Sequence, residues 1–285
     1  MHFVIFSAIV GSYDEIIQPS VTRDGFDFVL FSNTIKHSSL GIWQIRQIPY
    51  ENPDSTRVAR WVKTHPEELL PEYDASVWID ANILIRTTFL YERVINLFNK
   101  RVSLSTMCHG SRNCIYKEAA VVAYRGIEKE TLVLNWLRWL TRESYPHTHG
   151  LFETNVLYRI HNQDVLRFDK FWWSCIDHYS KRDQLSFNYC LWKLHLNCLF
   201  FISPFENTRN SEHFSLRPHE KRGKEHFAKN DIVLYFRALP QHGPNELGEI
   251  YEKLVGYSGY RFLRIPVSFF YKMKSCLILK YNMRI

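Results

Sequence analysis

The stretch that decides the fold of this chain is Val77-Trp78-Ile79-Asp80-Ala81-Asn82-Ile83. Its first three residues are apolar with a β-branched bias, which predicts a buried strand. The strand leads directly into an Asp-x-Asn pair, and open α/β sheets place their chemistry at the carboxyl ends of strands. Two interpretations stay open on this stretch alone. The pair binds a ligand or metal, or it makes an ordinary turn by bonding its own backbone.

Other segments predict further strands of the same sheet. Residues 3–10 are almost entirely apolar, residues 27–33 are apolar in the middle, and residues 43–48 alternate with period two. Residues 102–105 are a fourth candidate strand. Helical patterns separate these strands, and such alternation is typical of an α/β sheet.

Three helical patterns are clear. One begins at Asp54 or Ser55 as N-cap and ends at the His65-Pro66 break, and the others cover residues 90–100 and 128–142. The chain lacks both the Gly-x-Gly-x-x-Gly fingerprint and the P-loop pattern, which argues against dehydrogenases and P-loop enzymes.

The composition is that of a globular, aromatic-rich protein. The chain has 285 residues, of which 46% are hydrophobic and 15% aromatic. Its six cysteines are scattered without a C-x-x-C pair, which predicts reduced thiols in a cytoplasmic protein. We expect no signal peptide and no membrane-spanning helix, because no basic n-region precedes residues 3–10 and no apolar run reaches about 18 residues.

The formal charge of +7 resides in the C-terminal part of the chain, where Glu252 is the last acid and seven Lys and Arg follow it. Residues 261–285 combine six of these cations with aromatic residues, which suits an anionic membrane surface or a lipid-linked substrate. A peripheral position at the inner face of the membrane would follow. A basic face that is merely solvated stays an alternative, and nucleic-acid binding is the weakest interpretation.

Three cations share the first predicted helix. Arg57, Arg60 and Lys63 are spaced by three residues and form a slanting basic stripe upstream of the Asp-x-Asn strand. Arginine gives bidentate bonds to phosphate and lysine a point charge, so the stripe suits a diphosphate. Spacing alone leaves a solvated helix face equally open.

Three later segments also carry candidate site residues. His109 and Arg112 lie at a loop-to-helix junction that would suit a hydroxyl-rich ligand, although a lone His there is often structural. Glu153 is expected on a turn before a strand. Ser180 would cap the next helix, with Asp183 completing a capping box, which gives Asp183 a structural explanation.

The C-terminal third is harder to place. Residues 204–229 are polar and rich in histidine, which predicts a long loop or linker. A strand at 231–236, a helix at 246–255 and a helix after Pro266 follow, the last with a clean amphipathic face for three turns.

Together these motifs resemble one glycosyltransferase-like family, long described as a domain of unknown function, with members in bacterial surface-polysaccharide loci and in plants. The resemblance rests on segments that occur in the order Gly11-Ser12-Tyr13-Asp14, Arg57-x-x-Arg60-x-x-Lys63, Trp78-Ile79-Asp80-Ala81-Asn82, His109-x-x-Arg112 and Arg182-Asp183-Gln184-Leu185-Ser186-Phe187. It covers about residues 1–205 and leaves the tail uncovered. The expected organisation is a catalytic domain over 1–205, followed by a linker and basic, aromatic extension over 206–285.

The resemblance implies a GT-A-like fold, an α/β protein with a mixed, mostly parallel sheet flanked by helices. It implies that Asp80 and Asn82 are the D-x-D positions that hold Mn²⁺ or Mg²⁺ on the diphosphate of a nucleotide sugar, which by the same resemblance is a UDP-sugar. Arg57, Arg60 and Lys63 would assist with the diphosphate. Asn82 ligates through its carbonyl oxygen without charge.

The resemblance assigns the remaining roles as well. Tyr13 falls in the loop near the base, and His213 is the candidate third metal ligand. The substrate-binding candidates are His109, Arg112, Arg182 and Gln184. An inverting transfer needs a base within reach of the acceptor hydroxyl, and Asp183 and then Glu153 are the candidates.

The expected activity is therefore transfer of a sugar to a glycan or lipid-linked acceptor. Donor hydrolysis or sugar-phosphate transfer is another enzymatic possibility. Because Asn82 replaces an acid, a degenerate GT-A domain that binds glycan or a partner enzyme without catalysis stays open.

Overall fold

The computed structural model describes residues 1–11, 15–124 and 126–218. Tyr13 and residues 219–285 lie outside the described residues, so the predicted strand 231–236, helix 246–255, helix after Pro266 and basic tail stay predictions. Among the described residues no helix has the length and apolar character needed to cross a membrane.

One eight-stranded sheet organises the described chain, in the order β3-β4-β2-β1-β5-β8-β7-β9. Strands β1, β2, β4 and β5 pair in parallel, while β8 enters antiparallel between β5 and β7. The predicted mixed, mostly parallel α/β sheet is confirmed. The strand bounds are Phe3–Ile9 (β1), Phe26–Ser32 (β2), Ser39–Leu40 (β3), Trp43–Gln47 (β4), Ala75–Ile79 (β5), Leu104–Cys108 (β7), Phe152–Ile160 (β8) and Cys198–Phe200 (β9).

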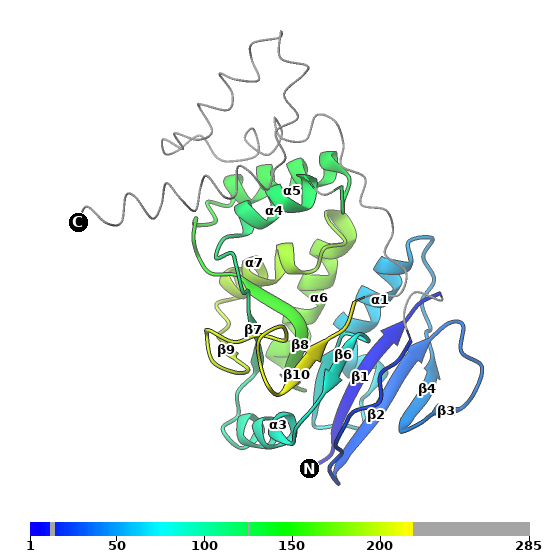
Figure 1. Ribbon diagram of the computed structural model, residues 1–285. Helices are drawn as coiled ribbons and strands as arrows, with labels where there is room; N and C mark the ends of the chain where they lie inside the picture. The colour runs from blue at the N-terminus through cyan, green and yellow to red at the C-terminus, as the bar shows by residue number, and fades with distance from the viewer. Residues whose placement is uncertain (12–14, 125, 219–285) are drawn as a thin grey trace, which may run out of the picture. The chain divides into compact units, whose positions relative to one another are not determined.

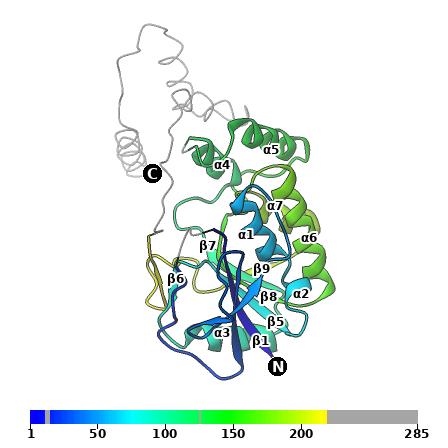
Figure 2. The same ribbon diagram turned by 90° about the vertical axis from the view of Figure 1, so that its right-hand side faces the viewer.

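Helices cover both faces of this sheet (Figures 1 and 2). Their bounds are Ser55–Thr64 (α1), Pro66–Leu69 (α2), Phe89–Asn99 (α3), Ile115–Tyr124 (α4), Glu130–Arg142 (α5), Gln163–His178 (α6) and Gln184–Leu194 (α7). Helices α1, α6 and α7 contribute to one apolar cluster and α3 to the other.

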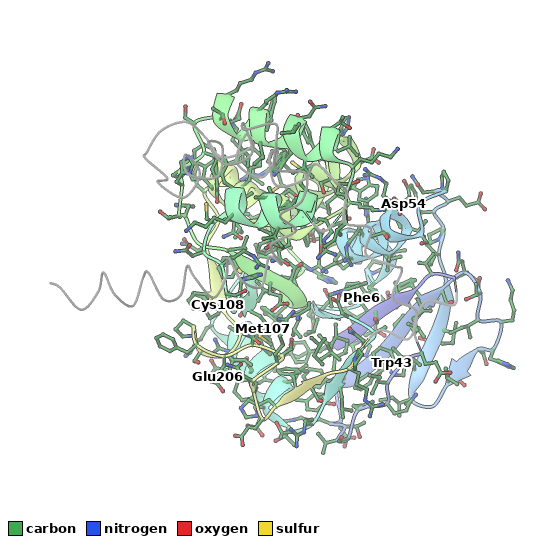
Figure 3. The ribbon with its side chains drawn as sticks, turned by 45° about the horizontal axis from the view of Figure 1, so that its top comes forward. Phe6, Trp43, Asp54, Met107, Cys108 and Glu206 are labelled. Atoms are coloured by element: carbon green, nitrogen blue, oxygen red, sulfur yellow. The ribbon has the colours of Figure 1, made fainter. Side chains whose placement is uncertain are left out.

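The two clusters follow from the alternation of side chains along each strand. In β1 and β5, Phe6 and Trp78 belong to the cluster beneath α1, whereas Ile5 and Val77 belong to the cluster against α3. Figure 3 labels Phe6 and Trp43, which belong to opposite clusters. Strands buried on both faces explain the near-continuous apolar runs in the sequence.

Helix α1 forms as its sequence predicts. The Asp54 side chain accepts the Thr56 N–H at 2.9 Å, and the helix ends at Thr64, just before the His65-Pro66 pair. Figure 3 shows Asp54 at the start of this helix. Val58, Trp61 and Val62 are buried, so the apolar side faces the core.

A small second sheet changes the predicted domain boundary. Strand β10 (Phe214–Leu216) pairs antiparallel with β6 (Ile83–Ile85), which directly follows the Asp-x-Asn pair. Backbone bonds at 2.8 Å and 2.9 Å tie Arg217 to Asn82 and Arg86 to His213. Residues 206–218 therefore pack with the sheet domain, and the described part of the loop or linker predicted at 204–229 is a loop that contains the strand β10.

Two local predictions also need correction. Glu153 lies inside β8 and not on a turn before it. Ser180 does not cap α7, since Asp183 is the N-cap residue and makes no side-chain cap bond. Instead the Ser180 hydroxyl accepts the Arg182 N–H at 3.2 Å and donates to Glu128, so it fixes the turn before the helix.

Candidate functional site

A cleft of about 680 Å³ opens at the carboxyl ends of β1 and β5. Such strand ends are where α/β proteins bind ligands. Five cations and three carboxylates line the cleft. They are Arg60, Lys63, Arg182, Arg209 and Arg217, and Asp80, Glu153 and Asp183.

Asp80 is held at the cleft by backbone and ring contacts. Its N–H donates to the Asn155 carbonyl at 2.9 Å, and its Oδ1 accepts the Trp78 indole N–H at 2.7 Å. Trp78 is fixed in turn by an edge-to-face contact with Phe6, with ring centroids 5.4 Å apart. The Asp80 side chain is still 29% exposed, so the carboxylate can contact a ligand.

Asn82, the second residue of the pair, is nearly buried. Its Nδ2 donates to the Arg217 carbonyl at 2.8 Å, and its own carbonyl accepts the Arg217 N–H. Because the amide nitrogen is engaged, Oδ1 is the side-chain atom of Asn82 suited to a cation. The Asp-x-Asn pair is thus joined to the segment that carries β10.

The centre of the cleft wall is a buried ion cluster around Asp183. Asp183 Oδ2 lies 2.5 Å from Lys63 Nζ and accepts the Thr154 hydroxyl at 2.8 Å, while Oδ1 lies 3.1 Å from Arg60 Nε. Burial opposes ionisation, but the charges of Arg60, Lys63 and Arg182 outweigh it and hold the pKa of Asp183 well below its usual range. The carboxylate is therefore a weak proton acceptor with both oxygens engaged.

Lys63 occupies an aromatic environment. Its ammonium lies 5.3 Å from the Trp78 ring centre and 5.8 Å from the Trp172 ring centre, and 4.0 Å from Asp80 Oδ1. Burial lowers the pKa of Lys63, and the attraction of Asp183 and Asp80 acts in the opposite direction. The same lysine thus links the Asp183 cluster to the Asp80 carboxylate.

Glu153 lies on the β8 side of the cleft. Its Oε2 forms an ion pair with Arg209 Nη1 at 2.5 Å, and its side chain is 9% exposed. Arg209 comes from the segment that precedes β10, and no sequence signal singled it out. Only the fold brings it to Glu153.

Arg182 and Gln184 also line the cleft, at the turn between α6 and α7. The sequence thus predicted seven of the residues that share the cleft with Glu153. These are Arg60, Lys63, Asp80, Asn82, Arg182, Asp183 and Gln184. Thr154 and Asn155, which also line it, carried no motif.

Four predicted site residues do not line this cleft. Arg57 donates from Nη1 to the carbonyls of Ile176 and Asp177 at the end of α6. Arg112 pairs with Glu118, and His109 Nδ1 accepts the backbone N–H groups of residues 111 and 112. The structure thus places Arg57, His109 and Arg112 outside the lining of the cleft and engages each of them in contacts within the domain.

His213 is the fourth. Its ring stacks on Phe89 with centroids 4.0 Å apart, and its Nδ1 lies 3.0 Å from the Thr87 hydroxyl. This places it beyond the far end of β6 from Asp80, since Phe214 pairs with Ile85. The structure therefore does not bring His213 to the cation site expected at Asp80.

The donors at the cleft still fit a divalent cation. Asp80 offers an exposed carboxylate and Asn82 a carbonyl oxygen, and such oxygens with waters are what Mn²⁺ and Mg²⁺ accept. Within residues 1–11, 15–124 and 126–218, no group of three or more His, Cys, Asp or Glu is arranged to hold a metal.

Fold and cleft define a class: an α/β domain with a charged ligand-binding cleft at the strand ends. The chain belongs to the family TOD1/MUCI70, glycosyltransferase-like domain, whose match covers residues 1–219. The predicted glycosyltransferase-like family is confirmed, and membership supports a general glycosyltransferase role.

The chain was also compared with curated proteins and with solved structures. No curated protein matches this chain. Among solved structures, the bifunctional glycosyltransferase WbbM in its apo form is similar, with a TM-score of 0.43 and 11% sequence identity. The match covers 70% of this chain and 38% of that chain.

Proposed function

We propose that this protein transfers a sugar from a nucleotide sugar, specifically a UDP-sugar, to a glycan or lipid-linked acceptor in surface polysaccharide synthesis. One observation carries the proposal. The Asp80 carboxylate lines the same cleft as Arg60 and Lys63 of α1, at the strand ends where nucleotides bind in α/β sheets. Sequence-family membership supplies the reaction class.

Asp80 and Asn82 Oδ1 would hold Mn²⁺ or Mg²⁺ there. A bound divalent cation neutralises charge on the diphosphate and acts as a Lewis acid. The protein itself fixes the position of the Asp80 carboxylate. The Trp78 indole N–H fixes one oxygen of Asp80, and the backbone bond to Asn155 fixes its position along the cleft.

The cations of α1 would stabilise the leaving group. A departing nucleoside diphosphate gains negative charge, and preorganised cations stabilise that charge without moving. Asp183 holds both Arg60 and Lys63 in place, so their positions are set before substrate binds. Asp183 thereby becomes a positioning residue in this proposal.

Glu153 is then the better candidate for the base of an inverting transfer. The Asp183 carboxylate is buried with both oxygens engaged and a depressed pKa, whereas Glu153 lines the cleft with only Oε2 in an ion pair. A base needs a free oxygen near the acceptor hydroxyl. This reverses the order of the two candidates expected from sequence.

The decisive experiment compares Asp80→Asn with wild type. The change keeps shape and an oxygen for the Trp78 bond but removes the charge, so Mn²⁺-dependent binding of UDP should weaken by about tenfold or more. Asp164→Asn is the matched control, since Asp164 is 65% exposed at the start of α6. Calorimetric affinities that do not change in Asp80→Asn would contradict the site assignment.

A second function is favoured by the state of Asn82, which brings no charge and gives its amide nitrogen to Arg217. A domain with this pair could bind glycan or a partner enzyme without turnover. Labelled-donor assays with glycan acceptors separate the two. Glycan binding without metal-dependent nucleotide binding or product would favour the non-catalytic role.

We propose in addition that the basic, aromatic residues 261–285 bind an anionic membrane surface, which would put the protein at the inner face of the membrane. The support is the absence of any acid after Glu252 in the sequence. Removing residues 261–285 should lower partitioning onto liposomes that contain anionic lipid, while neutral liposomes serve as control. Equal partitioning of both chains would exclude this role.

A further inference from the structure

The turn between α6 and α7 presents the residues Arg182, Asp183 and Gln184 to the cleft. The turn is rigid. The Arg182 N–H donates to Ser180 Oγ at 3.2 Å, and Trp172 Nε1 donates to the Asp183 carbonyl at 2.9 Å. These bonds fix the backbone from which the side chains of Arg182 and Gln184 extend.

Two donors on this turn are buried without a partner among the residues that the structure describes. Gln184 is 8% exposed, and its Nε2 makes no hydrogen bond to any described residue. Arg182 Nε is likewise buried and has no hydrogen-bond partner in the described part of the chain. Buried donors are nearly always satisfied, because leaving one unsatisfied costs the desolvation of the group. Two such donors, two residues apart in the lining of one cleft, point to a ligand that accepts hydrogen bonds.

The charge of this corner selects an anion. Asp183 is one carboxylate among three nearby cations, Arg60, Lys63 and Arg182, and Glu153 compensates Arg209. Within the described part of the chain, Arg182 forms no ion pair. Gln184 is also the first residue of the 11-residue helix α7, whose N-terminus attracts negative charge.

We propose that Arg182 and Gln184 form an oxyanion subsite of the cleft, and that Asp183 between them acts as a positioning residue for Arg60 and Lys63. The inference rests on the proposed function, because it names a chemical group that the substrate must carry. Two sources share this chemistry: the diphosphate of the donor, and an acid group on a sugar.

The test measures binding of two probes, inorganic pyrophosphate and glucuronate, with glucose as the neutral comparison. Gln184→Glu keeps the side-chain shape but replaces a donor with a negative oxygen. It should weaken binding of the relevant anion by about tenfold or more, and Arg182→Gln should do the same. Gln163→Glu is the matched control, since Gln163 is exposed and is the first residue of α6.

Each outcome decides the question. Loss of pyrophosphate affinity in both variants, but not in Gln163→Glu, supports the subsite and assigns it to the diphosphate. The same pattern with glucuronate, and none with glucose, assigns it to an acidic sugar. If wild type binds neither anion, or if both variants bind as wild type does, the subsite does not exist. Binding of UDP with Mn²⁺ by wild type and Asp80→Asn reports on the proposed function separately.

Discussion

Asp183 holds two cations in a buried cluster, so its charge matters to the fold as well as to the cleft. Asp183→Asn would leave Lys63, whose side chain is 1% exposed, without its closest carboxylate. Removing one partner of a buried ion pair costs about 3–5 kcal/mol. We expect the free energy of unfolding in urea to fall by about that amount. Asp164→Asn, at an exposed ion pair, should change it by less than about 0.5 kcal/mol, and equal effects would contradict the cluster's role.

The same carboxylate gives a pH dependence with a definite sign. Its folded pKa lies below the unfolded value of about 3.9, so its stabilisation is complete above that value and is lost as the pH falls toward the folded pKa. Acid unfolding of wild type should therefore be steeper below about pH 4 than that of Asp183→Asn.

Glu67 makes stability depend on pH in the opposite direction. Burial raises its pKa to about 8, with a smaller contribution from the nearby Asp169, and its Oε1 is buried without a partner among the described residues. The protonated form is favoured in the folded state, so stability is present below the unfolded pKa and is lost as the pH rises toward about 8. Glu67→Gln should match wild type near pH 4 and exceed it in melting temperature near pH 9. A gap that is constant with pH would contradict this.

At the scale of elements, the cap of α1 links stability to the cleft, because α1 carries Arg60 and Lys63. Asp54 accepts the Thr56 N–H and pairs with Lys181 at 2.8 Å, so Asp54→Ala should cost about 1 kcal/mol or more. Asn162→Ala removes the corresponding cap of α6, whose side chain accepts the Val165 N–H at 2.9 Å. Both variants should lose stability in a melt. Only Asp54→Ala should also weaken UDP binding, and equal binding by the two would contradict the link.

Local patterns predicted the elements that depend on local physics. The strands at residues 3–10, 27–33 and 43–48 and the helix after Asp54 were found within one or two residues. An apolar run predicts a strand that is buried on both faces, and an Asp before a helical pattern predicts an N-cap. The strand expected at 102–105 begins at Leu104, and α6 was not predicted.

The errors occurred where tertiary contacts decide. Ser180 followed by Asp183 has the spacing of a capping box, but Lys63 and Arg60 are the partners of that carboxylate. Arg57 has the same spacing as Arg60 and Lys63, yet it contacts α6, because three-residue steps rotate around the helix. The β6–β10 pair joins residues more than a hundred positions apart, which no local pattern records.

At the scale of the whole described domain, the segment from residue 206 to 218 completes both the cleft and the second sheet. Arg209 pairs with Glu153, Arg217 bonds to Asn82, and Phe214 is buried in the cluster against α3. A chain that ends at residue 205 would lose all three contacts and leave Glu153 without its cation. A chain that ends at residue 218 keeps them.

We therefore expect the 1–205 chain to unfold at a lower urea concentration than the 1–218 chain, and to expose apolar surface that binds a hydrophobic dye. The loss of stability and the dye binding would have the same cause. Without β10, the edge of strand β6 and the buried side chains of Ile83 and Ile85 become exposed to solvent. Phe214→Asp in the full chain tests the same contact without truncation and should lower the urea midpoint as well. Glu212→Gln, at an exposed neighbour, is its control. If 1–205 proved as stable as 1–218, the stable sheet domain would end at residue 205, and the contacts of Arg209 and Arg217 would be dispensable to it.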